Sequence, residues 1–157
     1  MVLNIGGNDY TIEFTIEASL CGLCTEKVTM LMANLSQAES ESDIKGVVKS
    51  ISDVPSTALA LLYGGLLEHH SDEIKTIDDA KSLIRIYLNE HKEDGTGDFY
   101  SIMDLMIEQM TNDGFFKLIG VDKMFQTEET KKQAKVPQDH KKKTTTKKTS
   151  TAKVGEK

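Results

Sequence analysis

The sequence predicts an α+β protein that is mainly α-helical, in which an N-terminal β-hairpin packs on a bundle of about five helices and a disordered C-terminal tail follows. Apolar residues alternate with period two only near the N-terminus, and they then recur at helical spacing as far as residue 110. Residues 1–127 contain 9 Lys/Arg and 21 Asp/Glu, a net charge of −12, whereas residues 128–157 contain 10 Lys and 4 Asp/Glu, a net charge of +6. We therefore expect one domain over 1–126 and a Lys/Thr-rich tail over 127–157 that is too poor in apolar residues to fold.

The hairpin is predicted over residues 2–15. Tyr10, Ile12 and Phe14 alternate with polar residues, which is the period of a half-buried strand. Residues 6–9 (GGND) accept the positive φ angles that a tight turn requires. Because a two-stranded hairpin is marginal alone, we expect a helix to cover one of its faces.

The spacing of apolar residues predicts five helices, over 16–35, 44–51, 54–68, 76–88 and 98–114. In the first of them, the residues expected to face the core are Leu20, Leu23, Val28, Leu31 and Leu35. Pro55 suits the first turn of the third helix, where its missing N–H costs nothing. This third helix is apolar on more than one face, so we expect it at the centre of the bundle.

Start and stop signals are clearest in the last two helices. Thr76 and Asp79 have the spacing of a capping box, and Asp98 can cap the following helix. Gly114 is suited to end that helix. A final apolar cluster over 115–125 closes the part of the chain that is expected to fold.

Cys21 and Cys24 form the only motif-like string, CGLC. A redox CxxC pair belongs at a helix N-terminus after a strand, whereas this pair is predicted to lie about one turn inside a helix. We therefore expect small, buried, inert thiols. A CxxC oxidoreductase remains as an alternative, and it requires a Cys21 thiol that titrates well below about 8.5.

Other chemistry is not indicated by the sequence. His69 and His70 are adjacent on a helix and point about 100° apart, so they do not make a zinc site with the cysteines. The acids around residues 93–98 lack the oxygen spacing of an EF-hand loop. We predict no catalytic residues, no metal and no cofactor.

Three methionines, Met103, Met106 and Met110, are spaced to share one face of the last helix. Flexible thioethers suit surfaces that accept varied apolar partners. The alternative is that these residues fill the core, as helix-spaced apolar residues usually do.

The basic tail could contact phosphates, but it contains no Arg and no aromatic residue that could stack on a base. Nucleic-acid binding is therefore not favoured, and a solubilising extension fits the composition better. No apolar run approaches a membrane span, and the N-terminal residues do not resemble a signal peptide. A cytoplasmic protein is expected.

The order of these segments resembles the tail assembly chaperones of long, non-contractile-tailed (siphovirus-type) bacteriophages and prophages of Gram-positive hosts. The resemblance covers about residues 2–120 and rests on the hairpin LNIGGNDYTIEF (3–14) and on the helix TALALLYGGLLEH (57–69). Within that helix, LYGGLL (62–67) matches an aliphatic–aromatic–small–Gly–Leu segment of the family. The Cys21/Cys24 helix and the long tail depart from the family pattern.

The resemblance implies a non-enzymatic assembly factor of the host cytoplasm that is absent from the mature virion. It would coat the tape measure protein in multiple copies or as a homo-oligomer, keep it soluble and recruit tail tube subunits. The residues predicted to contact partners or neighbouring copies are Leu59, Leu62, Tyr63, Leu66, Met103, Met106 and Met110. The family also commonly makes a longer product by ribosomal frameshifting. Because lysine codons are A-rich, we hypothesise a slippery run at Lys141–Lys143 or Lys147–Lys148. The alternative function is a small adaptor or regulatory protein whose basic tail contacts nucleic acid.

Overall fold

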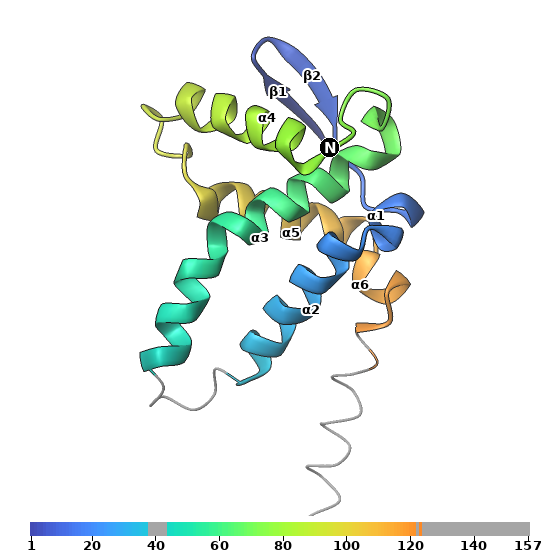
Figure 1. Cartoon of the computed structure of the whole chain (residues 1–157), viewed down its shortest axis with the longest axis vertical. Helices are drawn as coiled ribbons and strands as arrows, with labels where there is room; N and C mark the ends of the chain where they lie inside the picture. The colour runs from blue at the N-terminus through green and yellow to red at the C-terminus, as the bar shows by residue number, and fades with distance from the viewer. Residues whose placement is uncertain (38–43, 122, 124–157) are drawn as a thin grey trace, which may run out of the picture.

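The computed structural model describes residues 1–37, 44–121 and 123, and within them it is mainly helical with an N-terminal two-stranded sheet (Figure 1). The elements in order are β1 (Val2–Ile5), β2 (Asn8–Thr11), α1 (Ile16–Leu20), α2 (Gly22–Gln37), α3 (Ile44–His70), α4 (Ile77–Glu90), α5 (Phe99–Asn112) and α6 (Phe115–Leu118). The predicted fold class is confirmed. The tail over 127–157 lies outside the described residues.

The hairpin turn is shorter than predicted. Ile5 pairs with Asn8, so Gly6 and Gly7 alone make the turn, with φ of 62° and 76°. Two consecutive positive φ angles define the type I′ turn that matches the twist of a hairpin, and this turn leaves Asn8 and Asp9 in β2. The Gly6 N–H donates to both carboxylate oxygens of Glu90, at 3.1 and 3.0 Å, which fixes the turn to the end of α4.

The alternating pattern continues beyond the last residue of the sheet. β2 ends at Thr11, yet Ile12 and Phe14 are fully buried. Ile12 still pairs with Met1, and from Glu13 onward the chain pairs with helices: the Glu13 N–H donates to the Gly65 carbonyl of α3 at 2.9 Å. The Phe14 N–H donates to the Asp113 carboxylate at the end of α5, at 2.8 Å. This extended segment therefore joins the hairpin to the helical core.

The single helix predicted over 16–35 is two helices. Cys21 has an extended backbone (φ −74°, ψ 99°), so α1 ends there and α2 starts at Gly22. The break changes the phase of the helix, and Leu20 and Leu23 are exposed rather than directed into the core. Ala18 and Cys24 are buried instead, because only small side chains fit where these helices approach the backbone of α3 at Gly64. Val28 is buried as predicted, and Leu31 is partly buried.

The two helices predicted over 44–51 and 54–68 form one helix, α3, which continues through Pro55. Proline in a helix interior costs about 3 kcal/mol, because it removes an N–H donor and its ring crowds the preceding turn. Burial of the residues that follow offsets this cost and holds them helical. These buried residues are Thr57, Ala58, Ala60, Leu61, Leu62 and Leu66.

The central position of this helix is confirmed. α3 contacts α1, α2, α4, α5 and β2, and Figure 1 shows it running through the middle of the molecule with α2 alongside.

The predicted caps are confirmed. The Thr76 hydroxyl accepts from the Asp79 N–H, and the Asp79 carboxylate accepts from the Thr76 N–H, which completes a capping box at α4. The Asp98 carboxylate caps α5, and Gly114 follows that helix with φ of 71°. α6 then places the Phe115 ring in the core against Phe14, with ring centroids 5.5 Å apart. Of the predicted final cluster, residues 124 and 125 lie outside the described residues.

Candidate functional site

Most of the residues predicted to contact partners lie in the core. Leu62, Leu66, Met106 and Met110 are at most 1% exposed, and Met103 is 9% exposed. Leu59 and Tyr63 are partly buried, and the Tyr63 hydroxyl donates to the Lys75 carbonyl at 3.2 Å. The alternative, that helix-spaced methionines fill the core, is the one that the structure shows. A partner cannot reach the five buried side chains while the body is folded as described.

The reason is the pairing of α3 with α5. The methionine stripe of α5 packs against α3, so both apolar stripes are used to close the core. Sequence spacing locates an apolar stripe on a helix but does not say whether another helix covers it.

Exposed apolar side chains are concentrated instead on α1 and α2. Ile16, Leu20, Leu23 and Met30 are 63%, 74%, 39% and 49% exposed, and we call these four residues the α1–α2 surface. The other large exposed hydrophobic residues in the described ranges lie singly on β1, α4, α5 and α6: they are Val2, Ile86, Tyr100 and Leu118. Scattered apolar residues are ordinary, whereas several exposed apolar side chains on neighbouring turns make a candidate interaction surface.

The backbone explains how the α1–α2 surface is formed. Ile16 and Leu20 are four residues apart in α1 and therefore share one face, opposite the buried Ala18. Leu23 and Met30 are seven residues apart in α2, which places them on one side of that helix, two turns from each other. The sequence does not predict this surface, because a single unbroken helix over 16–35 would turn Leu20 and Leu23 inward.

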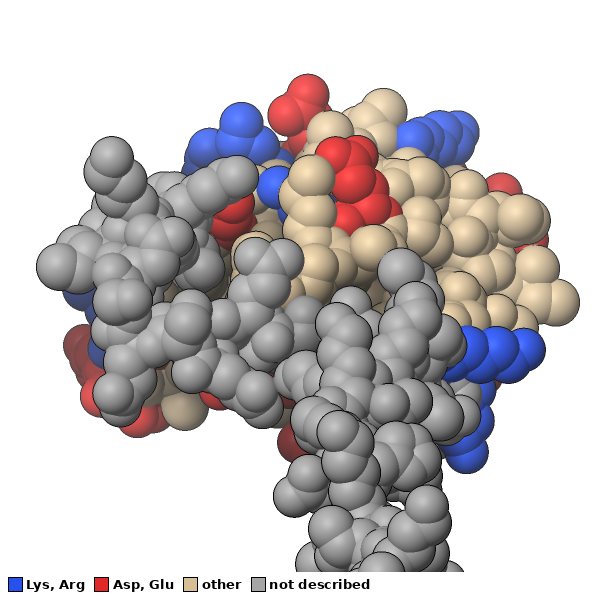
Figure 2. Space-filling model, turned by 90° about the horizontal axis from the view of Figure 1, so that it is seen from below, with Lys and Arg blue, Asp and Glu red and all other residues tan. Residues whose placement is uncertain are grey.

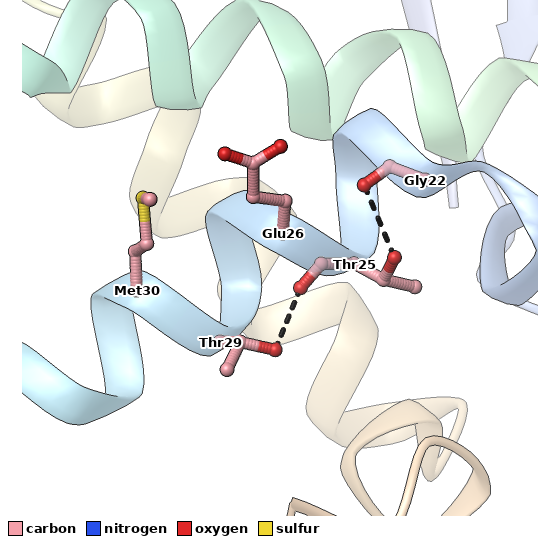
Figure 3. A pocket seen from close by; sticks show the side chains of 5 residues that line it. All are labelled: Gly22, Thr25, Glu26, Thr29 and Met30. Carbon is pink, nitrogen blue, oxygen red and sulfur yellow. Dashed lines mark hydrogen bonds between the residues drawn. The ribbon is translucent and has the colours of Figure 1, made fainter.

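A shallow hollow of about 380 Å³ lies along the outer side of α2, and its described lining residues are Gly22, Thr25, Glu26, Thr29 and Met30 (Figure 3). The Thr25 hydroxyl donates to the Gly22 carbonyl at 3.2 Å, and the Thr29 hydroxyl donates to the Thr25 carbonyl at 2.8 Å. Figure 3 shows Glu26 and Met30 projecting from the same side of the helix. The threonine hydroxyls are satisfied within α2, so a molecule lying here need not supply them with partners.

The charges beside the α1–α2 surface are mainly acidic. Glu17 and Glu26 are exposed. Lys27 is the only basic residue between residues 16 and 37, and its ammonium group donates to the Ser56 hydroxyl of α3 at 3.0 Å. On the face that Figure 2 draws, charged side chains are scattered between broad uncharged areas. An apolar surface with exposed carboxylates beside it favours an apolar partner that carries positive charge.

The cysteine pair lies at the junction of the two helices. Cys21 is at the break, directly before α2, and not one turn inside a helix as predicted. Cys24 is fully buried, and burial, with a smaller contribution from Cys21, raises its pKa to about 12. Its thiolate is therefore strongly disfavoured at neutral pH, which supports an inert structural thiol at Cys24.

His69 and His70 contact different groups of the N-terminal segment. His69 pairs with the Glu13 carboxylate at 2.5 Å, and His70 Nε2 accepts from the Thr11 N–H at 2.9 Å. The Tyr10 ring also lies against His70, with ring centroids 5.2 Å apart. Both histidines thus tie the N-terminal segment to the end of α3. Within residues 1–37 and 44–121, no three His, Cys, Asp or Glu side chains gather closely enough to hold a metal ion.

Comparisons with protein-family models, with curated proteins and with solved structures found no match to this chain. None of the described helices is both long enough and apolar enough to span a membrane.

Proposed function

We propose that this protein is a tail assembly chaperone of a siphovirus-type phage or prophage. In this role it binds the tape measure protein in the host cytoplasm, keeps it soluble, helps to recruit tail tube subunits and is absent from the mature virion. The resemblance of residues 2–120 to that family supports the proposal. The observation in the structure that carries it is the α1–α2 surface, which holds four of the eight large apolar side chains that are exposed in the described body.

A chaperone of this kind needs an apolar surface on a body that itself remains soluble. Four large apolar side chains are exposed on the α1–α2 surface, within a body whose net charge is −12 over residues 1–127. Like charge on each bound copy opposes precipitation of the complex, whereas the apolar contact holds each copy on its partner. We place the partner contact at this surface rather than at the buried methionine stripe.

The test is co-expression with the tape measure protein, which the proposal expects to be a large helical protein encoded beside this chain. We expect the body alone, residues 1–126, to raise the soluble fraction of that protein. Ile16→Glu places a charge on the α1–α2 surface and should abolish the effect. Ile86→Glu is the matched control, because Ile86 is also an exposed helical isoleucine but lies on α4. If the soluble fraction is unchanged by the unmodified body, or falls equally with both variants, the proposal is wrong.

The proposed longer product can be tested separately. A slippery A-rich run in the codons of Lys141–Lys143 or Lys147–Lys148, with an overlapping frame that continues past residue 157, supports frameshifting. Absence of the overlapping frame from the nucleotide sequence rules it out.

A further inference from the structure

We propose that the α1–α2 surface binds an amphipathic α-helix whose apolar stripe is bordered by Lys or Arg. This inference rests on the proposed function, because it names the kind of segment that the chaperone recognises.

The backbone of the surface favours a helical partner. α1 and α2 already pair the amide and carbonyl groups of their interiors within each helix, so they present no strand edge to which an extended peptide could hydrogen-bond. A segment that buries its own backbone against such a surface must satisfy its N–H and C=O groups internally. An α-helix does this, and an extended chain does not.

The apolar spacing fits the stripe of such a helix. Leu23 and Met30 are seven residues apart, which corresponds to about 10 Å along the helix axis. The hollow of about 380 Å³ beside Met30 can receive a large aliphatic side chain of the partner. Ile16 and Leu20 add two exposed apolar side chains on α1, directly before the break at Cys21.

The charges determine which amphipathic helix binds. Glu26 projects from α2 on the same side as Met30, and Glu17 is exposed on α1. Lys27 donates to Ser56, so its charge is directed toward α3. A partner with Lys or Arg beside its apolar stripe meets carboxylates, whereas a partner with Glu in those positions meets like charge.

The experiment uses the full chain and two fluorescent peptides, each about 18 residues long, which is roughly 27 Å as a helix. Both have the same composition and the same leucine stripe. Lys borders the stripe in one peptide, with Glu on the far face, and these positions are exchanged in the other. Fluorescence anisotropy should show roughly threefold to tenfold tighter binding of the Lys-bordered peptide at low salt, and a smaller difference at high salt.

Two charge reversals assign the effect to the surface. Glu26→Lys should remove or reverse the preference between the peptides. Glu108→Lys is the matched control, because Glu108 is an exposed acid on α5, and it should leave the preference unchanged. Leu20→Glu should weaken binding of both peptides.

Several outcomes overturn the inference. Equal binding of both peptides, or equal effects of the two charge reversals, shows that Glu17 and Glu26 do not select the partner. Binding of neither peptide, together with self-association of the chain that Leu20→Glu abolishes, assigns the surface to a second copy. The proposed function is judged by the co-expression assay alone, so its failure and the failure of this inference are distinguishable.

Discussion

Replacing either glycine of the Gly64–Gly65 pair by alanine should destabilise the protein, although alanine is the better helix former. A Cβ on Gly64 would lie 2.6 Å from Cys24 Sγ and 2.8 Å from Cys24 Cβ. A Cβ on Gly65 would lie 2.6 Å from Ile12 Cγ2 and 3.0 Å from the Phe14 ring. Carbon atoms in contact are ordinarily about 3.5–4.0 Å apart, so each added methyl group forces its neighbours away by about 1 Å.

Two opposing terms set the size of the effect. The change from Gly to Ala in a helix interior favours folding by about 1 kcal/mol. Overpacking of a filled core costs about 1–3 kcal/mol. At Gly65 the added methyl group meets two fully buried side chains, and the Gly65 carbonyl also holds the Glu13 N–H, so the cost should be near the upper end. We expect a net loss of about 2 kcal/mol for Gly65→Ala, which lowers Tm by roughly 5–10 °C.

Gly22→Ala is the matched control, because a Cβ on Gly22 meets no atom within 4 Å. Thermal and urea unfolding of the three variants should show Gly22→Ala as neutral or stabilising by a few tenths of a kcal/mol. Combining Gly64→Ala with Cys24→Ala removes the nearest sulfur atom, so the double variant should lose less stability than the two single losses predict. Equal Tm values for Gly22→Ala and Gly65→Ala would refute the close approach of α3 to the extended segment.

Three further predictions concern other contacts. Gly97→Ala should destabilise the protein more than Gly65→Ala does in urea unfolding, because the added Cβ would lie 2.6–2.7 Å from backbone atoms of Leu88 and His91, which cannot rotate away. A smaller loss of stability than that of Gly65→Ala contradicts this packing. Burial raises the pKa of Cys24 from 9.0 to about 12, so this thiol leaves folding stability unaffected below pH 9 and lowers it by up to about 1.4 kcal/mol per pH unit between pH 9 and 12. Cys24→Ala should reduce that slope, and an unchanged slope would show that the thiol is not buried. Glu90→Ala should speed amide exchange at Gly6 and lower stability by about 0.5–1.5 kcal/mol, and unaltered exchange would show that the turn is held by other contacts.

The sequence alone determined the elements whose signals are local. The capping box at Thr76, the cap at Asp98 and the stop at Gly114 are read from neighbouring residues, because the hydrogen bonds involved span two to four positions. The hairpin is predictable for the same reason. Only its turn is shorter than predicted, because four successive residues tolerate positive φ and the sequence does not show which two adopt it.

The tertiary structure alone decided which apolar faces are covered. The break at Cys21 arises because α1 and α2 must place Ala18 and Cys24 against Gly64, and this requirement lies forty residues further along the chain. It turns Leu20 outward while α3 covers the methionines of α5, so large apolar side chains are exposed on α1 and α2 whereas Met106 is buried. Periodicity specifies that a helix has an apolar side. Only the packing of distant segments specifies whether that side is in the core or available to a partner.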